Sequence, residues 1–84
     1  MRFEHNYIVN KIQSALIEAI DNIGMPEAIE IAEHYDVSSG LLRKVYMWDQ
    51  NKKQSFNLKK LFDVYEFACD INLGRKAIGK ASWA

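Results

Sequence analysis

Cysteine and proline each occur only once in this chain of 84 residues, as Cys69 and Pro26, and glycine occurs four times. A single cysteine excludes an internal disulfide and leaves too few soft ligands for a structural zinc site. Long apolar runs are also missing, and the first residues do not lead into the apolar stretch of a secretion signal. We therefore expect a protein without a membrane partner that resides in the cytoplasm.

Residue patterns that support catalysis or bind cofactors are lacking as well. His5 and His34 lie far apart in the sequence, and neither has a cysteine or paired carboxylates at the spacing of a metal site. The chain contains no glycine-rich phosphate loop and no grouping of serine, histidine and aspartate typical of a catalytic triad. We expect no metal, no cofactor, no catalytic residue and no small-molecule substrate.

The pattern that is present is helical, in a chain long enough for one core only. Hydrophobic residues make up 49% of the sequence, and residues 1–84 are expected to form a single domain. Apolar residues recur at three-and-four spacing over residues 7–23, with Asn6 as the expected N-cap and Gly24 as the stop. Pro26 fits the first position of a second helix.

Two further helices are predicted after the second one, which should end near Tyr35. Ser38 can cap a third helix, and the polar residues 48–56 that follow are typical of a surface loop. Asn57 then caps a fourth helix that continues to about Ile71 and carries two apolar stripes. The expected fold class is therefore all-α, a bundle of four to five helices.

Charge is distributed unevenly although the formal net charge is zero. Residues 1–40 contain two basic and seven acidic residues, whereas residues 41–84 contain nine basic and four acidic residues. Part of this positive charge lies in a basic C-terminal tail, residues 75–84. The second half of the chain is thus suited to an anionic partner.

Residues 28–47 have the pattern of a helix-turn-helix. Ala32 is the small residue required where the two helices approach each other most closely, and Asp36 tolerates the left-handed backbone that the turn requires. The buried contacts around this crossing are expected from Ile31, Tyr35, Val37, Leu42 and Val45.

This spacing resembles the helix-turn-helix of the lambda repressor and Cro superfamily, over about residues 12–73. A second similarity, to the lambda C-two-type lysogeny activators, lies in residues 12–17, Gly24, Ala32, Glu33 and Val37. The resemblance implies a bundle of lambda-repressor-like type, a double-stranded DNA operator as the partner, and a phage or prophage role in transcription control. The chain differs from the family at Ala28, where a phosphate-binding glutamine often opens the motif, and at Asp36, where the turn usually has glycine.

By position in that family, the residues facing the major groove would be Ser38, Ser39, Gly40, Arg43, Lys44 and Met47. Arg43 can form a bidentate pair with a guanine edge. Gly40 costs a helix about 1 kcal/mol relative to alanine, so it requires a reason such as close approach to DNA or tight packing. The loop that follows supplies side chains that can contact phosphates, namely Gln50, Asn51, Lys52 and Lys53.

The region of the fourth helix contains more aromatic residues than a small domain should leave in water. We therefore expect a homodimer formed by the fourth helix and the C-terminal segment. The expected dimerisation residues are Phe62, Tyr65, Phe67 and Trp83.

Two functions are consistent with these patterns. The first is a sequence-specific transcriptional regulator, not an enzyme, that reads the major groove with the helix at residues 39–47. The second is a helix-turn-helix-shaped module that binds a protein, such as a phage-encoded inhibitor or adaptor. The zero net charge and the acidic residues of the second helix, Glu27, Glu30 and Glu33, favour the second function.

Overall fold

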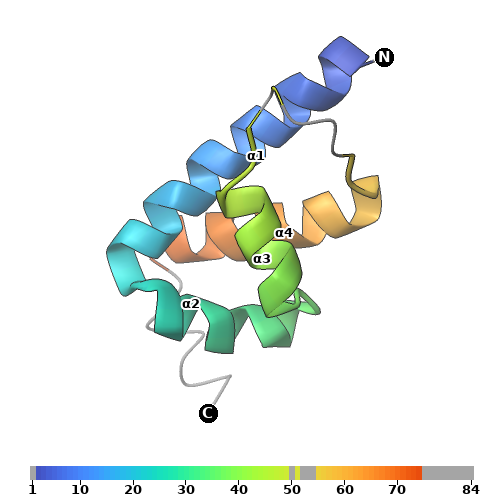
Figure 1. The fold of residues 1–84 in the computed structure, drawn as a ribbon. Helices are drawn as coiled ribbons and strands as arrows, with labels where there is room; N and C mark the ends of the chain where they lie inside the picture. Colours follow the sequence, from blue (N-terminus) through green and yellow to red (C-terminus); the bar gives the residue numbers. More distant parts are fainter. Residues whose placement is uncertain (1, 50, 52–54, 75–84) are drawn as a thin grey trace.

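The computed structural model describes residues 2–49, 51 and 55–74, and these residues form helices and their connections without a strand (Figure 1). The elements in chain order are α1 (Arg2–Ile23), α2 (Met25–Ala32), the short 3₁₀ helix η1 (Glu33–Tyr35), α3 (Ser39–Tyr46) and α4 (Leu58–Asn72). The all-α class predicted from the sequence is confirmed. Three predicted DNA-contact residues (Gln50, Lys52 and Lys53) and the predicted dimerisation residue Trp83 lie outside the described residues.

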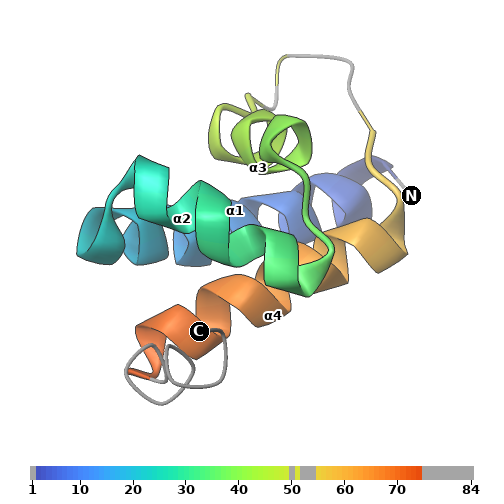
Figure 2. The same cartoon turned by 90° about the horizontal axis from the view of Figure 1, so that it is seen from below.

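The helix α1 is the longest element, with 22 residues, and the other helices pack around it. Figure 2 shows α3 on one side of α1 and α4 on the other. Side chains from every α-helix meet in a single hydrophobic core. Its members are Val9, Ile12, Leu16, Ala19, Ile20, Ala28, Ile31, Ala32, Val37, Leu42, Val45, Trp48, Leu61, Val64, Phe67, Ala68 and Ile71.

Gly24 ends α1, as the sequence predicts, with a φ of 84° that side chains other than glycine rarely adopt. Pro26 stands in the first turn of α2, where its missing N–H has no partner to lose. The beginning of α1 was predicted wrongly, because the helix starts at Arg2 and Asn6 lies inside it rather than at its cap. The reason is a contact distant in sequence: the Phe56 N–H donates to Nε2 of His5 at 3.2 Å, and the two rings stack, so the N-terminal turn has a partner.

The connection from α2 to α3 is as tight as a helix-turn-helix requires. Asp36 has φ 64° and ψ 32°, the left-handed conformation expected for it, and it is the only described residue other than glycine with positive φ. Its N–H donates to the Glu33 carbonyl at 3.1 Å, and the Val37 N–H donates to the Ala32 carbonyl at 3.0 Å. Because Val37 is also buried, the chain is held in place directly before α3 begins.

The other two predicted N-caps, Ser38 and Asn57, are confirmed. The Ser38 hydroxyl accepts a hydrogen bond from the Leu41 N–H at 3.1 Å, which satisfies one of the free donors at the start of α3. The Asn57 side-chain oxygen accepts from the Lys59 N–H at 2.9 Å and from the Lys60 N–H at 3.4 Å. The two helices that flank the candidate site therefore have fixed starting points.

The assignment of Phe67 to the dimer surface is wrong. Phe67 is fully buried, and its ring packs edge-on against Tyr35 with the ring centroids 5.6 Å apart. It belongs to the apolar stripe of α4 that faces α1, whereas Phe62 and Tyr65 lie on the exposed stripe. Trp48 is likewise a core residue rather than surface of the loop, and the single cysteine, Cys69, is half-buried.

The left-handed turn yields a stability prediction. Asp36→Gly should leave the free energy of unfolding unchanged or raise it by about 0.5–1 kcal/mol, because glycine adopts positive φ without a Cβ penalty. Asp36→Val should lower it by about 1–2 kcal/mol, because a β-branched side chain is disfavoured there. Urea unfolding of both variants, with Asp36→Asn as a control that tolerates the same conformation, measures the difference. Equal stability of the valine and glycine variants would contradict the left-handed conformation assigned to Asp36.

Candidate nucleic-acid interface

The helix α3 has one face in the core and one face in solvent. Leu42 and Val45 are fully buried against α1 and α2. All six residues predicted to face the major groove are exposed, and we call them the α3 face: Ser38, Ser39, Gly40, Arg43, Lys44 and Met47. The structure therefore gathers on one surface the residues that the sequence analysis selected.

Gly40 is not explained by packing against the described residues. Among them, a Cβ atom added at this position would have Ser38 Oγ, at 4.0 Å, as its nearest neighbour. Of the two reasons for a glycine in this helix, tight packing against the described part of the chain is thus absent. Close approach of another molecule to the α3 face is the reason left by the geometry.

The end of α3 is fixed by a side chain of α1. Nε2 of Gln13 donates to the Tyr46 carbonyl at 3.0 Å and to the Trp48 carbonyl at 2.8 Å. These bonds satisfy two carbonyls at the C-terminal end of α3, where no further helical turn supplies donors. Gln13 therefore ties the C-terminal end of α3 to α1.

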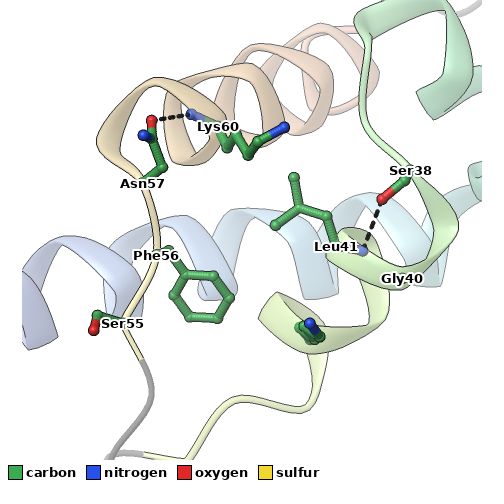
Figure 3. A pocket seen from close by; sticks show the side chains of 8 residues that line it. Ser38, Gly40, Leu41, Ser55, Phe56, Asn57 and Lys60 are labelled. Carbon is green, nitrogen blue, oxygen red and sulfur yellow. Dashed lines mark hydrogen bonds between the residues drawn. The ribbon is translucent and has the colours of Figure 1, made fainter.

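A groove of about 330 Å³ lies between the start of α3 and the segment that leads into α4 (Figure 3). Lys44 of α3 and Lys60 of α4 both line it. Its other lining residues are Ser38, Gly40, Leu41, Ser55, Phe56 and Asn57. Figure 3 shows Ser38 and Asn57, the caps of α3 and α4, at this groove, so the partial positive charge of two helix starts adds to that of two lysines.

Sequence analysis missed Gln13 and Lys60 as contributors to this surface. The pair Lys59–Lys60, two and three residues after the Asn57 cap, was an available signal, since a basic first turn opposes the helix dipole and calls for an explanation. Nothing in the sequence pairs Gln13 with Tyr46. Of the loop residues predicted to contact phosphates, only Asn51 is described; it is exposed, and its N–H donates to Asp49 Oδ1 at 2.9 Å.

Acidic side chains lie on the elements next to α3. Glu30 of α2, Glu33 of η1 and Asp36 of the turn are all exposed. Within the part of the chain that the structure describes, acidic, histidine and cysteine side chains form no cluster able to hold a metal ion. Nor does any described helix combine the length and apolar character needed to cross a membrane.

Comparison of the chain with protein-family models, with curated proteins and with solved structures gives no match. The resemblance to the lambda repressor and Cro superfamily therefore stays a prediction.

The hydrogen bonds of Gln13 predict a specific loss of stability. Gln13→Ala removes both donors and leaves two carbonyls at the end of α3 without this partner, which should lower the free energy of unfolding by about 1–3 kcal/mol. Asn10→Ala, an exposed position on the same helix, is the matched control and should change it by less than about 0.5 kcal/mol. Denaturant unfolding compares the two. Equal losses in both variants would show that Gln13 does not hold α3.

Proposed function

We propose that this protein binds double-stranded DNA in a sequence-specific manner and reads the major groove with α3. The observation that carries the proposal is the α3 face: six exposed residues on a helix whose opposite side is fixed in the core. A recognition helix must be both rigid and exposed, because base edges are read only by side chains held in register. In this proposal the chain acts by binding, without catalysis.

The chemistry of the α3 face suits base edges. Arg43 presents a planar donor that can pair with O6 and N7 of guanine, and Ser39 can bond to a base or to a phosphate. Gly40 lets the start of α3 approach the DNA closely, in accord with the open space around it. These three residues are the proposed sequence-reading set.

The groove beside α3 suits the DNA backbone. Lys44 and Lys60 bring two ammonium groups to it from two different helices, and cationic side chains next to a recognition helix can neutralise phosphates. Asn51 and the adjacent loop residues Gln50, Lys52 and Lys53 extend the same role along the chain. Contacts of this kind position the protein and set the salt dependence, whereas the α3 face supplies specificity.

The order of helices around the turn supports the narrower proposal of a lambda-repressor-like regulator. Two helices joined by a left-handed residue, then a loop, then a helix on the far side of α1 are the elements that the resemblance implies. A transcriptional regulator of phage or prophage type that acts in the cytoplasm follows from that resemblance.

One observation favours a different class. Exposed Glu30 and Glu33 beside α3 repel a phosphate backbone, and a helix-turn-helix-shaped protein-binding module would not meet this repulsion. A mobility-shift assay with genomic fragments separates the two functions. Enrichment of one site supports DNA reading, and no retardation of any fragment at low salt supports the protein-binding module.

Arg43 yields a prediction about specificity. Arg43→Ala should weaken binding to the selected site by about 1–3 kcal/mol and binding to random DNA much less, because a base contact is lost. Arg43→Lys is the matched control: it keeps the charge but loses the planar fork, so random binding should persist while specificity falls. Titration of both DNAs measures the ratio of affinities. An unchanged ratio in both variants would show that α3 does not read bases.

Lys60 yields a prediction about salt. Lys60→Ala should weaken binding to selected and random DNA alike, and should reduce the slope of log affinity against log salt by about one unit. Lys11→Ala is the control, because Lys11 is equally a single cation but lies over the Tyr7 ring on the outer side of α1. Titrations at several salt concentrations give the slopes. Equal slopes for the Lys60 variant and the unaltered chain would show that the DNA backbone does not bind at the groove.

A further inference from the structure

The helix α4 has a second apolar face that no described part of the chain covers. Leu58, Phe62 and Tyr65 are 50%, 57% and 45% exposed. They follow one another at spacings of four and three, so they share one side of the helix. We call these three residues the α4 patch.

The α4 patch faces away from α3. Lys60 lines the groove with α3, and Leu58 and Phe62 are each two positions from it, which is about 200° around a helix with 3.6 residues per turn. Figure 2 shows the same relation, with α3 and α4 on opposite sides of α1. The α3 face and the α4 patch therefore point in opposite directions, on either side of α1.

Opposite charges line one edge of the α4 patch. Lys59 and Glu66 are both exposed and stand seven positions apart, which places them on the same side of the helix. Within the patch Tyr65 is neutral at ordinary pH, as tyrosine generally is, and the hydrogen bond and the electrostatic interaction with the Cys69 side chain raise its pKa further. The patch is thus apolar in the middle and has a basic and an acidic end on its border.

We propose that a second copy of this chain docks on the α4 patch, with the two α4 helices antiparallel and crossing at Phe62. In this register Phe62 meets Phe62 of the other copy, Leu58 meets Tyr65, and Lys59 meets Glu66. The midpoints of the three pairs all lie within about half a residue of Phe62, so a single two-fold arrangement brings the aromatic, aliphatic and charged contacts together.

The area of the patch sets the strength of this dimer. Two half-exposed aromatic rings contribute on the order of 100 Å² each, so the patch remains well below the roughly 800 Å² per partner of a standard interface. Self-association through it is weak and depends on concentration. It becomes effective when copies are gathered on DNA, which raises their local concentration.

The two-fold arrangement has a consequence for DNA that rests on the proposed function. A two-fold axis in the plane of the interface turns each patch toward the other, so the α3 faces end up at the two outer ends of the dimer. A palindromic site requires both recognition helices on one side of a single duplex, about 34 Å apart. The dimer therefore joins two duplex segments, each bound by one copy.

The interface is tested first without DNA, on the full chain. Sedimentation from low to high micromolar concentration should show dimer formation, Phe62→Glu should abolish it, and Tyr7→Glu, an equally exposed aromatic position at 57%, should not. A monomer at every concentration overturns the proposal. If the double variant Ile78→Ser with Trp83→Ser then dimerises, the C-terminal segment is identified as the occupant instead.

The register is tested by charge exchange. Lys59→Glu and Glu66→Lys should each weaken the dimer several-fold, because each sets like charges opposite one another, and the double variant should restore it. Circular dichroism checks that helicity is unchanged, since Lys59 also lies 3.5 Å from Asp63 within the helix. Failure of the double variant to restore the dimer overturns the antiparallel register.

The DNA consequence is tested by capture of a second duplex. An immobilised duplex bound by the full chain should retain a labelled second duplex, and the Phe62→Glu variant should bind the first duplex with unchanged affinity but retain no second one. Duplex binding by a chain that stays monomeric overturns this inference and leaves the proposed function intact. A Phe62-dependent dimer that binds no duplex overturns the proposed function and the joining of two duplexes, but it supports the α4 interface.

Discussion

The direction of α3 depends on the short connection between Ala32 and Val37. Two backbone hydrogen bonds and the left-handed conformation of Asp36 determine the direction in which the backbone leaves η1. Burial of Val37 then fixes the position of the residue before the α3 cap. Without that constraint, α3 could rotate about its own axis, and the division into buried and exposed sides would be lost. The exposure of Arg43 and Gly40 on the outer side of α3 depends on this turn.

The helix α1 separates α3 from α4, because each of them packs its buried side against α1. On one side it receives the buried residues of α3 and fixes the helix end through Gln13; on the other it receives the inner stripe of α4. The sides of α3 and α4 that do not touch α1 are left exposed on opposite sides of the molecule. The proposed DNA-reading surface and the proposed association surface are thus separated by α1.

Local chemistry made much of this predictable from the sequence. A left-handed aspartate and the caps Ser38 and Asn57 follow from rules that involve neighbouring residues only, and the structure confirms all three. Contacts distant in sequence were not predictable: the pairing of His5 with Phe56 extends α1. The inner and outer stripes of α4 both have helical spacing, so only packing against α1 decides that Phe67 is buried.

Zero net charge limits how a DNA-binding surface of this kind can work. A strongly basic protein is drawn to DNA over long distances, but here the exposed glutamates of α2 and η1 offset the lysines at that range. Among the described residues, Lys44, Lys60 and two helix starts place positive charge at the groove, and this charge acts within about one Debye length of roughly 8–10 Å. Favourable contact then requires the start of α3 to be seated in the DNA, and that is the place where Gly40 leaves room for it. In the proposed function, the binding free energy is smaller on random DNA, where α3 does not fit the groove, than on a site that Arg43 and Ser39 contact. Neutrality of the whole chain therefore favours specificity over affinity.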